Sequence, residues 1–235
     1  MKFNRALLYA LDGSLSEPAQ FQNLLKFYWT QSFGLTGVSP VTQWSDALNG
    51  QALTPGTAPT LATTWTGSQP TLIFTSASSQ FLQSTAAGIK AIAEGIRTPY
   101  SVSWQARYTT AVGFTWSWDD GGTTNRHQMR VTNATTFTYV TQISSGTLTV
   151  SDITAADYVY TFVDTGTSQV IYQNGVAHNI SANINNGTGV TGTTFQLGRG
   201  SGGNYTNAKI RRFGMSARAL SATDALNLYT LWNAA

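Results

Sequence analysis

Residues 100–108 read YSVSWQARY and residues 114–118 read FTWSW, and in both stretches apolar residues alternate with mostly polar ones. A period of two residues is typical of a β-strand that buries one face. The second stretch runs into DDGG at 119–122, a combination that favours a turn. The middle of the chain is therefore predicted to form β-strands rather than helices.

Further short strands follow toward the C-terminus. Asn174-Gly175 stands between two of them and is typical of a two-residue hairpin turn, because both residues tolerate a positive φ. Regularly spaced short strands with turn signals indicate a sandwich or a barrel. We expect an all-β fold, a two-sheet antiparallel β-sandwich with a short helix near each end of the chain. The expected strands lie around 127–132, 136–143, 147–150, 158–163, 168–173, 176–180, 193–198 and 208–215.

The composition of the 235-residue chain agrees with this fold class. Charged residues make up 10 % and hydrophobic residues 41 %, so there is material for a core and too little charge for a disordered tail. No stretch approaches the roughly 18 apolar residues of a membrane span, and we expect no membrane insertion. The chain has no cysteine, which excludes disulfides and thiolate metal sites.

The N-terminal residues follow a different pattern. Ser16 suits a helix N-cap, and the apolar residues after it recur at i, i+3, i+4, i+7 and i+8, which predicts a short helix over 18–30. One interpretation packs this helix on the sandwich. The other leaves it free to bind a partner, since helix-in-groove recognition uses the same spacing. The candidate partner-binding residues are Phe21, Leu24, Leu25, Tyr28 and Trp29.

Under the second interpretation, residues 1–34 form an anchoring or oligomerisation arm, and residues 35–235 form the sandwich domain. Subunits of a symmetric assembly gain avidity for repeated surface ligands, so we expect a homo-oligomer. At the other end of the chain, Ser221 and Asp224 are spaced as a capping box, which predicts the start of a C-terminal helix.

Basic residues are too few to indicate a nucleic-acid-binding protein. The net charge is +3, and the only tight basic group is Lys209, Arg211 and Arg212, with Arg218 nearby. Nucleic-acid-binding proteins gather many basic residues on one face, whereas a short charge run is typical of a solvated strand face. We expect the solvated face and no nucleic-acid partner.

Catalytic and metal-binding patterns are missing from the sequence. Glycosidases use two carboxylates about 5 to 9.5 Å apart. However, Glu17 lies in the first turn after the Ser16 N-cap, Glu94 lies in a helical turn expected within 85–97, and Asp119-Asp120 lies in a predicted turn. The chain has 2 histidines, too few for a histidine-rich metal site. We therefore expect no catalytic residues, no enzyme activity, no metal site and no cofactor.

Two predicted turns carry the residue types that bind sugars, namely aromatic rings and side-chain amides or carboxylates. Alternation with polar residues predicts core burial for one of them, Trp118, so the two interpretations of that tryptophan stay open. The candidate ligand-binding residues are Trp118, Asp119 and Asp120 at one turn and Asn204, Tyr205 and Asn207 at the other.

The order of several short motifs resembles a concanavalin-A-like lectin/glucanase domain of the laminin-G-like type. WSD at 44–46 and QPTLIF at 69–74 resemble its opening, VIYQNG at 170–175 resembles its Y-x-N-G hairpin, and residues 195–221 resemble its closing pattern. One departure is Asn207-Ala208, where a glycine usually precedes the penultimate strand. The resemblance covers roughly residues 38–235 and implies a two-sheet jelly roll.

Free-standing domains of this type with little charge and no cysteine resemble virion proteins of tailed bacteriophages. The resemblance implies a non-enzymatic virion surface protein, such as a capsid decoration, head fibre or tail appendage, that binds other virion proteins and cell-surface glycans. Without a secretion signal, such a protein is expected to be made in the host cytoplasm and to end in the virion. A free-standing carbohydrate-binding module and, more distantly, a polysaccharide hydrolase stay open, as does a loosely bound calcium ion.

Overall fold

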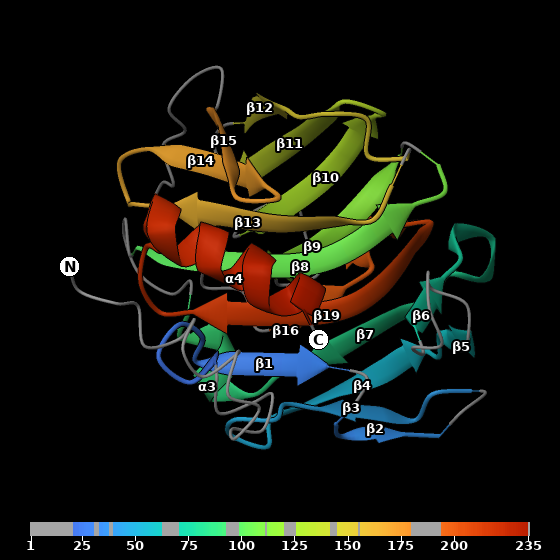
Figure 1. The fold of residues 1–235 in the computed structure, drawn as a ribbon. Helices are drawn as coiled ribbons and strands as arrows, with labels where there is room; N and C mark the ends of the chain where they lie inside the picture. The colour runs from blue at the N-terminus through green and yellow to red at the C-terminus, as the bar shows by residue number, and fades with distance from the viewer. Residues whose placement is uncertain are drawn as a thin grey trace.

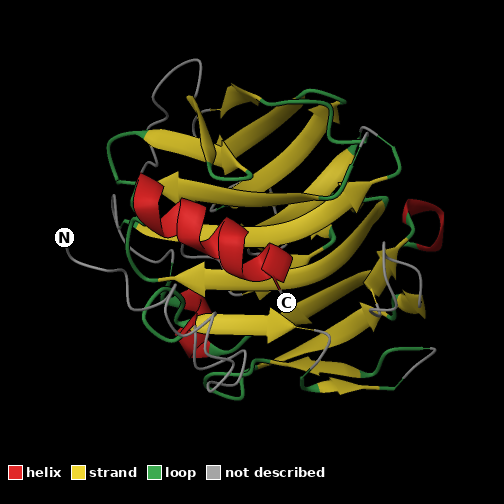
Figure 2. Cartoon of the chain, in the orientation of Figure 1, coloured by secondary structure: helices red, strands yellow, loops and turns green. Residues whose placement is uncertain are grey.

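Two antiparallel sheets pack face to face in this computed structural model, and one helix covers the outer face of the first sheet (Figure 1, Figure 2). The structure describes residues 21–30, 33–37, 40–62, 71–92, 99–110, 112–119, 126–141, 145–154, 156–179 and 194–234. The all-β, two-sheet antiparallel sandwich expected from the alternating pattern is confirmed.

The eight-stranded sheet has the order β15-β14-β13-β8-β19-β6-β5, and β1 also pairs with β19. β6 pairs with the first residues of β19 and β1 with the last, so both lie along the same edge of that long strand. The strands of this sheet are β1 (Phe27–Thr30), β5 (Thr60–Ala62), β6 (Thr71–Phe74), β8 (Tyr100–Tyr108), β13 (Tyr158–Asp164), β14 (Gln169–Gln173), β15 (Val176–Asn179) and β19 (Ala208–Ser216).

The nine-stranded sheet has the order β12-β11-β10-β9-β16-β7-β4-β3-β2. A separate two-stranded hairpin pairs β17 (Arg199–Gly200) with β18 (Asn204–Tyr205). The helical elements are η1 (Ser76–Ser78), α3 (Ala87–Lys90) and α4 (Ala222–Ala234). The strands of the second sheet are β2 (Leu35–Thr36), β3 (Gln43–Ser45), β4 (Ala52–Thr57), β7 (Phe81–Ser84), β9 (Gly113–Asp119), β10 (His127–Asn133), β11 (Thr136–Thr141), β12 (Ser145–Thr149) and β16 (Thr194–Leu197).

Aromatic side chains fill the space between the two sheets. Trp104 on β8 stacks on Tyr160 of β13 with ring centroids 5.3 Å apart, and it meets Trp116 of β9 edge to face at 6.4 Å. Such ring pairs add to the stabilisation from buried area alone. Each alternating stretch therefore forms a strand, and the apolar face of that strand contributes to the main core.

A second apolar cluster lies between the eight-stranded sheet and α4, which crosses in front of that sheet in Figure 1. Trp232 of α4 stacks on Tyr28 at 6.0 Å and meets Phe21 edge to face at 6.2 Å. The capping box predicted for this helix is confirmed, since the backbone N–H of Asp224 donates to Ser221 Oγ and the N–H of Ser221 donates to the Asp224 carboxylate.

The helix expected over 18–30 is wrong for residues 22–30, because 22–26 form turns and irregular backbone and 27–30 form β1. Phe27 pairs with Met215 and Thr30 with Arg212 along β19. Trp29 is buried in the core between the sheets, whereas its neighbour Tyr28 is buried in the cluster under α4. Only an extended backbone sends adjacent side chains to opposite faces, and the residues FYWT satisfy this alternation as well as the helical spacing.

The five candidate partner-binding residues are buried within their own chain. All are 9 % exposed or less, so none offers a surface to a partner in the folded protein. The interpretation that packs this stripe on its own sandwich is the one that the structure supports, and residues 21–30 continue the fold rather than precede it. An anchoring role for residues 1–20 lies outside the described residues. The buried residues are Phe21, Leu24, Leu25, Tyr28 and Trp29.

The solvated strand face expected for the basic group on β19 is wrong for two of its members. A bulge between Ile210 and Arg212 breaks the simple alternation, and Arg211 and Arg212 are 7 % and 2 % exposed. Arg212 lies beneath α4, where its guanidinium donates to Gln105 Oε1 at 2.8 Å and to the carbonyl oxygen of Trp232 at 2.7 Å. The helix thus covers Arg212, a charged residue that the local sequence pattern places on the solvated face.

The predicted Asn174-Gly175 hairpin turn is confirmed, with φ of 52° and 79°. We expect Gly175→Ala to lower the free energy of unfolding more than Gly50→Ala does. Both glycines have a positive φ that costs alanine roughly 1 kcal/mol. However, a Cβ at Gly175 meets Leu226 Cα at 3.1 Å, and a Cβ at Gly50 meets nothing within 4 Å. Urea denaturation of both variants measures the difference, and equal losses would contradict the contact with α4.

Within the described residues, no helix is both long enough and apolar enough to span a membrane.

Candidate ligand-binding surface

The β17–β18 hairpin folds across the outer face of the nine-stranded sheet, where it contacts β9. Gly200 sits directly on the ring of Phe114, and a Cβ there would lie 2.3 Å from the ring carbon Cγ. Ser117, which alternates with the buried Trp116 and Trp118, places its Oγ 3.0 Å from the carbonyl oxygen of Arg199. The hairpin is thus fixed against the sheet by one close backbone contact and one hydrogen bond.

Arginines and aromatic rings surround this hairpin. The guanidinium of Arg199 lies 4.7 Å from the ring centroid of Phe81 and 5.7 Å from that of Tyr205. Arg130 on β10 lies 5.8 Å from the ring of Phe114. Such cation–π contacts hold a guanidinium in place without neutralising it. The arginine–aromatic surface consists of these residues and of Arg126, which donates to Ser201 Oγ at 3.0 Å: Phe81, Phe114, Arg126, Arg130, Arg199 and Tyr205.

The three arginines of this surface form no ion pair with a carboxylate of the described residues. The ion pairs seen there join Arg107 to Asp157 and Arg218 to Asp224, both elsewhere in the fold. Arg130 is exposed, while Arg126 and Arg199 are half-buried. The surface therefore presents three positive charges in a chain with few charges of any kind.

A small polar cluster lies beside the hairpin on the same sheet face. Ser117 Oγ is 2.8 Å from Asp119 Oδ2, and Gln128 Nε2 is 3.5 Å from the same oxygen. The Asp119 carboxylate is buried, with 1 % of the residue exposed. Gln196 on β16 places its Oε1 3.5 Å from Ser117 Oγ. These hydrogen bonds connect the end of β9 to its neighbours β10 and β16, and they place polar side chains beside the hairpin.

The structure separates the predicted sugar-binding residues into two groups. Asn204 and Tyr205 reach the outer face of the nine-stranded sheet, where Asn204 is exposed and Tyr205 is half-exposed. Asp119 lies on the same face, but it is 1 % exposed and bonded to Ser117, so the expected contact with a ligand is wrong for this residue. Trp118 is buried in the main core, and its indole N–H donates to the carbonyl oxygen of Ile89, so the expected sugar-stacking role is wrong for this residue. Core packing, the other interpretation of Trp118, is correct. Asp120 lies outside the described residues.

Asn207 acts within the fold. Its Nδ2 donates to Ser76 Oγ at 2.7 Å and to Thr110 Oγ1 at 2.9 Å, and its Oδ1 accepts from the backbone N–H of Ser76. All these bonds join separate loops, so the side chain is not free to bind a ligand.

Sequence reasoning missed the arginines and both phenylalanines of the surface. Gln128 and Arg130 alternate with the buried Met129 and Val131 on β10, so period-two analysis of that strand places them on the outer face. No local signal indicates that the hairpin after Gly198 crosses β9 and brings Arg199 to the same face.

A second polar network lies inside the core. Tyr100 and Tyr139 place their hydroxyls 3.0 and 2.9 Å from His127 Nδ1, and Tyr139 donates to Asp164 at 3.3 Å. Burial raises the pKa of both tyrosines well above its ordinary value, and the charge of Asp164 adds to this effect. All four residues are 3 % exposed or less, so the network has no contact with a dissolved substrate.

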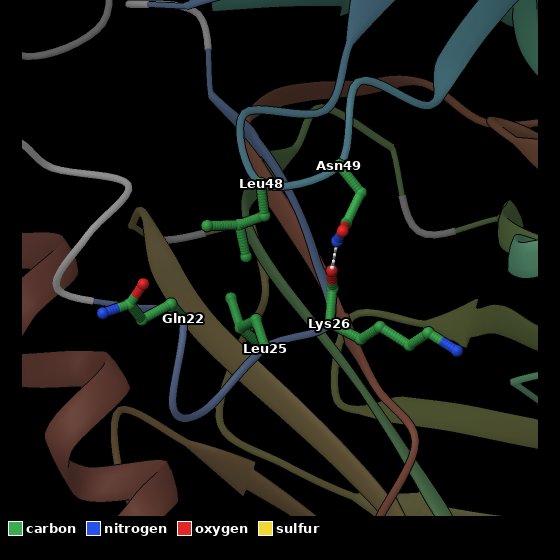
Figure 3. A pocket seen from close by; sticks show the side chains of 5 residues that line it. All are labelled: Gln22, Leu25, Lys26, Leu48 and Asn49. Atoms are coloured by element: carbon green, nitrogen blue, oxygen red, sulfur yellow. Dashed lines mark hydrogen bonds between the residues drawn. The ribbon is translucent and has the colours of Figure 1, made fainter.

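A pocket of about 350 Å³ opens where the 21–26 segment meets the turn after β3 (Figure 3). Asn49 Nδ2 donates to the carbonyl oxygen of Lys26 at its wall. No aromatic ring is among the described residues that line it, so these residues offer less to a sugar ring than the arginine–aromatic surface does. The lining residues are Gln22, Leu25, Lys26, Leu48 and Asn49.

No group of three or more metal-binding side chains of His, Cys, Asp or Glu occurs in the part of the chain that the structure describes.

Comparison with known proteins finds similar structures but no similar sequences. No protein-family model matches the sequence, and no curated protein matches it either. Among solved structures, the botulinum neurotoxin serotype C1 binding domain has a TM-score of 0.64 at 12 % identity, over 90 % of this chain and 53 % of that chain. Trypanosoma rangeli sialidase has a TM-score of 0.60 at 8 % identity, over 89 % of this chain and 33 % of that one.

A third structure, of botulinum neurotoxin type C, whose cell entry is described as dependent on two ganglioside molecules, has a TM-score of 0.61 at 15 % identity, over 88 % of this chain and 51 % of that chain. The chain thus spans about half of the neurotoxin binding domains and a third of the sialidase. At these identities the likeness is one of fold alone, a β-sandwich.

Proposed function

We propose that this chain is a non-enzymatic glycan-binding β-sandwich and that the arginine–aromatic surface is where it contacts sugar. The observation that carries the proposal is the half-exposed ring of Tyr205, which lies beside the Arg199 guanidinium and directly follows the exposed Asn204 on β18. A sugar ring presents apolar C–H groups that pack on an aromatic ring, and hydroxyls that accept or donate hydrogen bonds.

The fold relatives support this proposal, because one of them is described through its interaction with gangliosides. The position of the surface supports it too. Side chains on paired strands of a sheet are held in place before the ligand arrives, so less conformational entropy is lost on binding.

We further propose that the protein belongs to the surface of a tailed-bacteriophage virion, bound to other virion proteins and assembled as a homo-oligomer. The low charge, the lack of cysteine and the lectin-like sandwich support this setting. Light scattering measures the oligomeric state, and detection of the protein in purified virions tests the location. A monomer absent from virions would contradict this part of the proposal and leave glycan binding intact.

Binding to bacterial surface polysaccharides tests the glycan proposal. With immobilised capsular polysaccharides and lipopolysaccharide O-chains, we expect saturable retention of the protein and no release of reducing ends. Tyr205→Ala is expected to weaken binding roughly tenfold, about 1.4 kcal/mol, because the ring loses its packing against the sugar.

Tyr229→Ala is the matched control, since Tyr229 is also half-buried but lies on α4 over the other sheet. It is expected to leave affinity unchanged. Equal effects of the two variants would overturn the assignment of the surface, and release of reducing ends would indicate a hydrolase instead.

A further inference from the structure

No described carboxylate forms an ion pair with the three guanidiniums of the arginine–aromatic surface. Three guanidiniums stand around one hairpin, and the described carboxylate on this sheet face, Asp119, is buried and bonded to Ser117. Burying or crowding cations without partners is costly, so such a grouping is uncommon unless an anion completes it. Elsewhere on the described chain, exposed arginine charges do meet carboxylates, as Arg218 does with Asp224.

The guanidiniums are also held in fixed positions with donors to spare. Arg199 lies against Phe81 and Tyr205, Arg130 lies against Phe114, and Arg126 bonds to Ser201. The Nε atoms of Arg126 and Arg199 are shielded from solvent, so the outer Nη groups are the donors that a ligand can reach. A planar guanidinium with free N–H groups matches the two oxygens of a carboxylate better than it matches a lone hydroxyl.

We infer that the ligand of this surface is an acidic glycan whose carboxylates bind Arg126, Arg130 and Arg199 while a sugar ring packs on Tyr205. The inference rests on the proposed glycan-binding function and names its ligand class. A nucleic acid fits the surface less well, because stable binding to a phosphate backbone uses many more cationic contacts along an extended track.

The test compares each acidic capsular polysaccharide in its native form with the same polymer after its carboxyl groups have been reduced to primary alcohols. The sugar sequence is kept and only the charge is removed. We expect the protein to bind the native polymers, to lose at least roughly tenfold in affinity for the reduced ones, and to bind the native polymers more weakly as salt is added.

The double variant Arg130→Gln/Arg199→Gln is expected to lose the preference for native over reduced polymer. The matched control Lys26→Gln/Lys209→Gln removes the same net charge from the exposed Lys26 and the half-buried Lys209, both outside the arginine–aromatic surface, and is expected to keep the preference. Arg130→Gln alone changes an exposed side chain and carries the test if the double variant does not fold.

The outcomes separate the inference from the function on which it rests. Equal binding of native and reduced polymers, or binding of neutral polysaccharides alone, would overturn the acidic ligand and leave glycan binding standing. Retention of no polysaccharide would overturn both. Tighter binding to a DNA or RNA oligonucleotide than to any acidic polysaccharide would overturn the ligand class in favour of nucleic acid.

Discussion

A chain that lacks residues 1–34 is expected not to fold. The deletion removes β1 and the buried side chains that precede it, which contribute to both apolar clusters. Burying each large apolar side chain is worth roughly 1.5–3 kcal/mol, and whole domains are stable by only about 5–15 kcal/mol. Circular dichroism in the near ultraviolet, which reports on packed aromatic rings, measures the loss. The buried side chains removed are Phe21, Leu24, Leu25, Phe27, Tyr28 and Trp29.

A pair of point variants keeps the chain at full length and serves as the control. Trp29→Ala is expected to cost about 3–5 kcal/mol, because the ring is fully buried. Phe33→Ala is expected to cost little, since Phe33 is 50 % exposed. A truncated chain that unfolds cooperatively, with the stability of the full chain, would show that the segment is an arm after all.

Arg212→Ala is expected to lower the free energy of unfolding by about 3 to 5 kcal/mol, because it breaks hydrogen bonds from a buried charged group. The guanidinium joins three elements of the fold. Its Nε donates to the Tyr28 hydroxyl of β1 at 3.1 Å, and its Nη1 donates to Gln105 of β8 and to the carbonyl oxygen of Trp232 near the end of α4. Removing it leaves a buried amide oxygen and a buried carbonyl without this donor, and each unsatisfied group adds to the cost.

Urea denaturation measures this loss, and NMR of the α4 amides shows whether the helix detaches first. Lys209→Ala, three residues away on the same strand but half-exposed, is the control and is expected to change stability by less than about 0.5 kcal/mol. A small effect at Arg212, equal to that at Lys209, would mean that α4 is held by its apolar contacts alone.

Much of the sandwich could be predicted because alternation is a local property. The period of two residues over β8 and β9, the turn at Asn174-Gly175 and the cap at Ser221 each depend on neighbours within a few residues. The segment 27–30 could not be assigned in the same way, because FYWT fits a helix and a strand equally and its pairing partner is β19, at the other end of the chain.

The site depended still more on distant contacts. Tyr205 and Asn204 were identified from their residue types, but the arginines around them come from β10, from its start and from the hairpin. The local pattern places Arg212 on the surface, but α4 covers it in the folded chain. For the arginines around the hairpin and for Arg212, contacts between distant elements decide whether the charge is exposed to solvent, and the local sequence pattern does not.

Because β1 pairs with β19, the partner strand of β1 is synthesised long after β1 itself. Tyr28 and Arg212, which are hydrogen-bonded in the folded chain, are 184 residues apart in sequence. At the usual rate of about 5–20 residues per second, β1 leaves the ribosome roughly 10 to 40 seconds before its partner strand does. Throughout that interval the aromatic residues of β1 have no partner strand, so they stay unpaired in the nascent chain until β19 has been synthesised. Long-range pairing of this kind slows folding and favours association with other chains, and we expect the yield of folded protein to rise with lower temperature or added chaperone.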